Sequence, residues 1–168
     1  VSVFTAPRDL LEALPAQAPD CVLTDVMMDD IDGFGLAEKV HQHFPSTALI
    51  FMTAWPSATD AVTSFQKFKG VNYIQKPMLP DAILEAVKSA VEWSRPRKMA
   101  LAALEPLTGR EREVLGLMAE GHSNKQIAHK LELSQKTIEY HRASLMSKMG
   151  SADLPTIYAN WRLVNDIV

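Results

Sequence analysis

The sequence lacks the features that mark several large classes of protein. Cys21 is the only cysteine in 168 residues, so the chain has no internal disulfide and no thiolate-bound metal site. No apolar run approaches the roughly 18 residues that a membrane span needs. The first residues also lack the charged start and apolar core of a secretory signal. These absences predict a cytoplasmic protein with no membrane partner.

The composition permits a real core and places positive charge unevenly. Apolar residues make up 47% of the chain, and the length suits one ordinary domain or two small ones. The net charge of −3 argues by itself against a nucleic-acid partner. Between His122 and Lys148, however, five lysines and arginines stand against two glutamates. A local basic strip of this kind can meet phosphates even on an acidic protein.

The first 93 residues alternate short apolar runs with amphipathic segments. The pattern predicts strands at 1–4, 21–24, 48–53 and 71–74, and helices at 8–14, 35–44, 59–69 (closed by Gly70) and 81–93. Ala48–Thr53 is continuously apolar, as in a strand that is covered on both faces. The alternation predicts a doubly wound parallel sheet. Because the chain starts inside a predicted strand and without Met, we expect it to be a fragment.

The second half carries helix signals only. We predict a linker at 94–104 and a helical domain at 105–168. Thr108 with Glu111 and Ser123 with Gln126 form two capping boxes, each opening a helix. Further helices are predicted at 134–149 and 153–164. About three residues join the helix at 124–131 to the helix at 134–149, which is the spacing of a helix-turn-helix.

The helix that starts at Ser134 has two faces. The inward positions are predicted to be Ile138, His141, Leu145 and Met149. The outward positions suit the base edges of DNA, where Lys donates to guanine, Glu accepts from cytosine, and Tyr and Ala meet a thymine methyl: Lys136, Glu139, Tyr140 and Ala143. Four further residues are predicted to face phosphates: Lys125, Thr137, Arg142 and Lys148. Two alternatives stay open, namely an interaction domain with a solvated charged face, and a base contact by His141.

Three polar residues end consecutive predicted strands. Asp25, Thr53 and Lys76 would therefore converge at the carboxyl edge of the sheet, where such sheets bind ligands. A carboxylate nucleophile beside a hydroxyl and an ammonium suits phosphoryl chemistry. The alternative is a purely structural Asp–Lys pair.

The sequence resembles a known family in its second half. The elements LT-x-RE-x-EVL, G-x-SNK-x-IA and S-x-KTIE-x-HR, within about residues 107–164, resemble the LuxR-type helix-turn-helix of response regulators, close to its FixJ-type branch. The resemblance implies that the helix from Ser134 enters the major groove of double-stranded DNA, in the base-facing and phosphate-facing arrangement given above. It also implies a homodimer, with 153–164 as the frequent dimer contact.

The first half resembles a second module of the same proteins. CVLTDVMMDDIDGFGL, ALIFMTAW and VNYIQKP resemble three strand ends of a receiver domain, over about residues 1–93. The resemblance implies Asp25 as phosphoacceptor, Thr53 as switch hydroxyl, Tyr73 as switch aromatic and Lys76 as phosphate-binding lysine before a cis proline. It further implies a histidine-kinase partner, and Mg²⁺ held by Asp25 and the Met27 carbonyl.

Two departures from the receiver pattern bear on the metal. Asp29 stands where the family has proline, and the chain begins after the position of the family's first strand. That strand and its helix, about 30 residues, carry an acidic pair, so one of three metal-binding carboxylates is present. We expect Asp29, Asp30 and Asp32 to form a solvated loop and not to replace the pair.

The sequence thus predicts a receiver-like α/β domain of flavodoxin-like type, truncated at its N-terminus, followed by an all-α four-helix DNA-binding domain. The expected function is a two-component transcription regulator that is activated by phosphorylation of Asp25 and by dimerisation. A pseudo-receiver that binds DNA independently of phosphorylation is the alternative. An enzyme, such as a phosphohydrolase, is not expected, because Met27 occupies the second acidic position of Asp-x-Asp.

Overall fold

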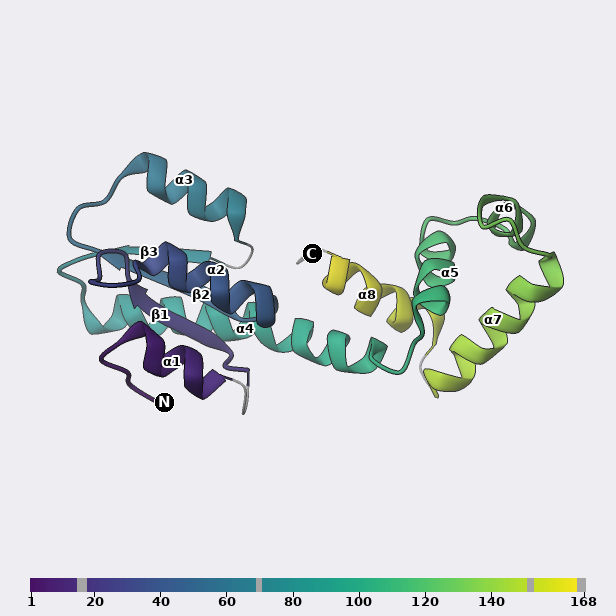
Figure 1. Cartoon of the computed structure of the whole chain (residues 1–168), viewed down its shortest axis with the longest axis horizontal. Coiled ribbons are helices and arrows are strands. Elements are labelled where there is room, and N and C mark those ends of the chain that lie inside the picture. Colours follow the sequence, from purple (N-terminus) through teal and green to yellow (C-terminus); the bar gives the residue numbers. More distant parts are fainter. Residues whose placement is uncertain (15–17, 69–70, 151–152, 166–168) are drawn as a thin grey trace. The chain divides into compact units, whose positions relative to one another are not determined.

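A computed structural model describes residues 1–14, 18–68, 71–150 and 153–165, which fall into two compact units divided between Pro96 and Arg97. The first unit contains α1 (Pro7–Ala13), β1 (Cys21–Asp25), α2 (Gly33–His43), β2 (Ala48–Thr53), α3 (Ala58–Lys67), β3 (Val71–Gln75) and the start of α4 (Pro80–Leu104) (Figure 1). The second contains the end of α4, then α5 (Gly109–Ala119), α6 (Asn124–Lys130), α7 (Gln135–Lys148) and α8 (Leu154–Asn165).

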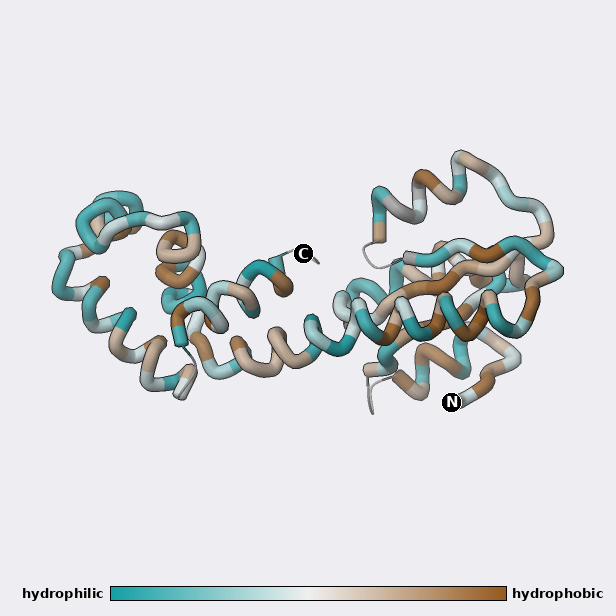
Figure 2. The backbone as a smooth tube through the Cα atoms, turned by 180° about the vertical axis from the view of Figure 1, so that it is seen from behind, coloured by the Kyte–Doolittle hydropathy of each residue, from teal (hydrophilic) through white to brown (hydrophobic). Residues whose placement is uncertain are grey.

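The sheet of the first unit is parallel, as predicted, and its strand order is β1-β2-β3. Its central strand, β2, is an apolar run in the hydropathy colouring of Figure 2, and residues 48–51 are fully buried. Leu49 and Phe51 pack into a core with α1 and α2, while Ala48 and Ile50 pack on the opposite side against α4. Alternate residues of β2 therefore serve the two faces of a covered sheet.

Residues 1–4 are the first correction. A strand was predicted there, but Val1, Val3 and Phe4 are exposed in irregular chain. A strand needs a neighbour to pair its backbone groups, and among the described residues this segment has no strand beside it. Apart from α4, the other helices and strands of the unit lie within two residues of their predicted bounds, and Gly70 lies outside the described residues.

The predicted end of the helix near Trp93 is the second correction. The helix expected to end near Trp93 continues through Pro96 to Leu104 as α4, so the segment 94–104 is helical throughout. Pro96 removes one helical hydrogen bond and costs about 3 kcal/mol. Ala100 and Leu104, one turn apart, are fully buried in a core of the second unit. That burial holds the end of the helix in place. It is a tertiary contact, which the composition of residues 94–104 alone does not reveal.

The second unit is built around α5. Thr108 and Ser123 make the predicted capping boxes at the starts of α5 and α6. Val114 of α5 packs in one core with Ile127 and Ile138, and Leu115 in another with Leu145 and Ile157. Gly121 (φ +84°) follows the end of α5, and Glu132 (φ +54°) lies in the turn between α6 and α7. None of the helices in the described ranges combines the length and apolar character that crossing a bilayer requires.

Candidate functional sites

The three strand ends meet at one edge of the sheet. Asp25 is paired with Met52 and Thr53 with Gln75 in the strand register. The chain leaving each strand is tied to the next strand, because the Val26 N–H donates to the Met52 carbonyl (2.8 Å) and the Lys76 N–H to the Thr53 carbonyl (2.7 Å). The edge therefore brings the predicted residues Asp25, Thr53 and Lys76 to one place.

Asp25 and Lys76 are in direct contact. The Lys76 ammonium donates to Oδ2 of Asp25, and the Met27 N–H donates to Oδ1 at 3.1 Å. Burial raises the pKa of the Asp25 carboxyl, but the hydrogen bonds of Lys76 and Met27 and the lysine charge outweigh it, so its pKa lies below the usual range. The Asp25 side chain remains 30% exposed. The carboxylate is thus ionised and accessible, as a nucleophile must be.

The two predicted switch residues, Thr53 and Tyr73, lie on the neighbouring strands β2 and β3. The buried Thr53 hydroxyl accepts from the Trp55 N–H at 3.2 Å, in the loop after β2. The Tyr73 ring packs near Phe51, with ring centres 6.5 Å apart. Within the part of the chain that the structure describes, the buried Tyr73 hydroxyl has no hydrogen-bond partner. The predicted Lys76–Pro77 cis peptide is present.

The described residues do not make up a magnesium site by themselves. Asp25 is the carboxylate at the edge, and one of its oxygens is taken by Lys76. Asp30 is paired with Arg8 (2.7 Å), and Asp32 caps α2 by accepting from the Gly35 N–H (2.7 Å). Over the described ranges, no three His, Cys, Asp or Glu side chains gather where they could hold a metal. That the acidic loop does not replace the missing acids stays a prediction.

The residues of α7 that are predicted to face bases are exposed to solvent. Lys136, Glu139, Tyr140 and Ala143 are all exposed, and Tyr140 is 70% exposed although it is a large aromatic residue. On the other side of the helix Ile138 and Leu145 are fully buried and Met149 packs against the core. His141 is half-buried, with its ring edge-on to Tyr140. The outward face is therefore available to a groove.

The four residues predicted to face phosphates divide into two kinds. Lys125 is exposed on the first turn of α6, and Thr137 lies in the first turn of α7, where its hydroxyl contacts that of Ser134. Arg142 instead donates to the Asn124 side chain at 2.7 Å, and the Lys148 ammonium lies 2.7 Å from Glu111. Contact of these four residues with DNA phosphates stays a prediction.

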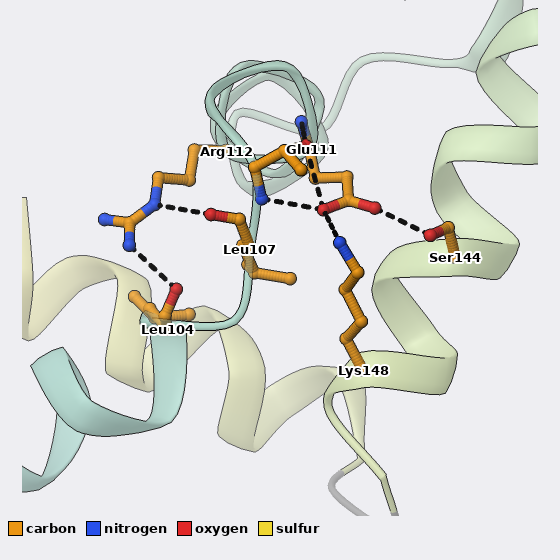
Figure 3. Close-up of polar contacts among 7 residues, drawn as sticks. Leu104, Leu107, Glu111, Arg112, Ser144 and Lys148 are labelled. Carbon is orange, nitrogen blue, oxygen red and sulfur yellow. Dashed lines mark hydrogen bonds and ion pairs between the residues drawn. The ribbon is translucent and has the colours of Figure 1, made fainter.

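Glu111 makes contacts that sequence reasoning predicted only in part. Its capping role was predicted, but its carboxylate is also 96% buried and accepts from Ser144 and Lys148 of α7, each at 2.7 Å (Figure 3). Burial raises its pKa, but the hydrogen bonds of Lys148, Ser144 and Thr108 lower it to about 2. Ser144 and Lys148 lie four residues apart on α7 and so share one face of the helix. That spacing was the one sign in the sequence that both could contact the same acid.

Comparisons with known proteins match both units. A model of the response regulator receiver domain matches residues 1–88, and one of the luxR family of bacterial regulatory proteins matches residues 105–159. The transcriptional regulatory protein FixJ of Bradyrhizobium diazoefficiens is 30% identical over 92% of this chain and 78% of its own length. FixJ of Rhizobium meliloti is 33% identical over 86% and 76%.

A solved structure was also found. The full-length FixJ of B. japonicum is 27% identical, covers 100% of this chain and 86% of its own, and superimposes with a TM-score of 0.47. The receiver match falls on the α/β unit, and the match to the luxR family falls on the helical unit that follows it. The chain therefore belongs to the response regulators that join a receiver domain to a DNA-binding domain of the luxR family.

Proposed function

We propose that this chain is a transcription regulator whose binding to DNA is switched by phosphorylation of Asp25. The observation that carries the proposal is the Asp25–Lys76 contact at the carboxyl edge of the sheet. An accessible ionised carboxylate beside an ammonium is equipped to receive a phosphoryl group. The proposal that the chain binds DNA rests on the family, because luxR-type domains are the DNA-binding part of these regulators.

The chemistry assigned to the receiver unit is a phosphoryl transfer. An oxygen of Asp25 forms a bond to phosphorus while the bond between phosphorus and the donor, a phosphohistidine of the kinase, breaks. Lys76 already touches the carboxylate and would balance the charge of the transferred group. The Thr53 hydroxyl would leave Trp55 and turn toward the phosphate. That exchange of partners is the local event that biases the switch.

Mg²⁺ is the ion that receiver domains use for this transfer. Asp25 and the Met27 carbonyl are the oxygen donors that this chain would contribute, and the described residues do not complete the site by themselves. We further propose that the protein acts in the cytoplasm as a homodimer on double-stranded DNA, and that it turns over no small substrate as an enzyme.

The test is phosphate incorporation by the natural protein that contains this sequence. With its histidine kinase or a small phosphodonor and Mg²⁺, intact mass should rise by one phosphoryl group, and Asp25→Asn should abolish the rise. Asp29→Asn is the matched control, since Asp29 is an exposed acid four residues away. Incorporation that persists in Asp25→Asn would move the phosphoacceptor elsewhere. No incorporation in the unsubstituted protein would favour a pseudo-receiver that binds DNA independently of phosphorylation.

A further inference from the structure

We propose that Lys148 acts inside the protein, together with Glu111, to set the position of α7 in the DNA groove, and that it is not a phosphate contact. The inference rests on DNA binding through α7, as in the proposed function. It reassigns a residue at the end of α7 that the sequence pattern placed among the phosphate contacts.

The geometry is that of a closed internal pair. The Lys148 ammonium lies 2.7 Å from Oε2 of Glu111, whose side chain is 4% exposed, while the lysine side chain is one-third exposed. Moving the ammonium outward to a phosphate would leave a buried carboxylate without its cation, which is strongly unfavourable. The lysine therefore has a partner that competes with DNA and that DNA cannot replace.

Glu111 connects two helices through both of its oxygens. Oε1 accepts from the Ser144 hydroxyl, and Oε2 accepts from Lys148 and from the N–H and hydroxyl of Thr108, at 2.8 and 2.9 Å (Figure 3). Ser144 and Lys148 lie on successive turns of α7, so their contacts with one carboxylate restrain both the rotation and the sliding of α7 against the start of α5.

A second contact holds α7 from another side. Arg142 donates to Asn124, the first residue of α6, at 2.7 Å. The two contacts leave α7 with one orientation relative to α5 and α6. The outward residues Lys136 and Glu139 are carried on the same rigid helix, so an error in its position would displace every base contact together.

The salt dependence of binding separates the two roles of Lys148. Each phosphate contact contributes about 0.9 to the slope of log affinity against log salt concentration. Lys148→Met keeps most of the aliphatic side chain and removes the charge. If Lys148 positions α7, this variant should leave the slope unchanged and lower the preference for specific over unrelated DNA about tenfold, the scale of one lost base contact.

The experiment uses the full chain and a duplex that the unsubstituted chain selects from a random-sequence pool. Lys125→Ala serves as the phosphate control and should flatten the slope by about 0.9, while Glu139→Ala shows the loss of preference from one base contact. The double variant Glu111→Gln, Lys148→Met removes both charges of the pair. It should recover most of the preference, because no buried charge is left unpaired.

Two results would overturn the inference. One is a slope that Lys148→Met flattens by about 0.9 and that the double variant does not restore, which would make Lys148 a phosphate contact. The other is a preference that none of the variants at 111 and 148 changes. If Lys148→Met alone fails to fold, the double variant decides between the two roles. Loss of a phosphate contact would still flatten the salt dependence of its DNA binding. Failure of the unsubstituted chain to select any duplex would instead count against the proposed function.

Discussion

Replacing Gly33 with alanine should lower the free energy of unfolding of the first unit by about 3 kcal/mol. A Cβ at this position would lie 2.2 Å from the carbonyl oxygen of Asp25 and 3.0 Å from the Cα of Val26. Both neighbours are backbone atoms at the end of β1, and the Gly33 N–H is itself bonded to the Val26 carbonyl at 3.0 Å. The chain that carries Asp25 would have to move, because no flexible side chain can give way.

Gly109→Ala is the matched control, because both glycines are the first residue of a helix. A Cβ at Gly109 meets nothing within 4 Å, so alanine should change stability by less than about 1 kcal/mol, in the stabilising direction. Hydrogen exchange read separately on peptides of the two units in urea would measure both effects. Equal stability of Gly33→Ala and the unsubstituted first unit would show that the end of β1 is not packed as described.

The second unit should lose about 3 kcal/mol of stability in acid because of Glu111 alone. Its pKa is held at about 2 in the folded state, against the ordinary 4.5 of an unperturbed glutamate. A carboxyl whose folded pKa is lowered stabilises fully above the unfolded pKa. Its contribution then disappears as the pH falls from about 4.5 to about 2, where the buried group takes up its proton and loses the attraction of Lys148.

The difference between variants isolates this contribution from the other carboxyls. Glu111→Gln should be less stable than the unsubstituted chain at pH 7, and the gap should close progressively below pH 4.5. Glu113→Gln, which changes an exposed residue on the same helix, should show no such pH-dependent gap. Urea unfolding across this pH range provides the measurement. A gap of constant size down to pH 2 would mean that Glu111 is not the titrating group.

The local signals in the sequence located most of the fold. The capping pairs Thr108–Glu111 and Ser123–Gln126 placed two helix starts correctly, because a cap is formed by residues that are neighbours in the chain. The apolar run of β2 predicted its burial on both faces for a similar reason. These predictions depend on short-range contacts, which a sequence displays directly.

The misses depend on partners that are distant in the sequence. Pro96 favoured a helix end near Trp93, and only the burial of Leu104 in the second unit explains why α4 continues. The contact of Lys148 with Glu111 also joins distant residues, because Glu111 lies 37 residues earlier, while the phosphate role of Lys148 stays a prediction that our inference replaces. Lys148 was assigned to phosphate by its position on the helix that is predicted to enter the groove, and the sequence pattern of α7 alone contains no sign of the buried acid.

For the candidate sites, too, the sequence predicted some features and missed others. Asp25 and Lys76 were expected at one edge, because parallel strands end together, and they are in contact. Gly33 was not singled out, since its close approach to Asp25 arises only when the loop after β1 folds back. The roles of Thr53 and Tyr73 after phosphorylation stay predictions, as do the base contacts of α7.

The central claim is that the state of Asp25 controls the DNA affinity of α7. The direct measurement is the binding of the natural protein to its selected duplex, by fluorescence anisotropy, before and after incubation with phosphodonor and Mg²⁺. We expect a roughly tenfold or greater rise in affinity, within the usual range of allosteric coupling, and no rise in Asp25→Asn. Equal affinity of the phosphorylated and unphosphorylated protein, with phosphate shown to be on Asp25, would contradict the claim.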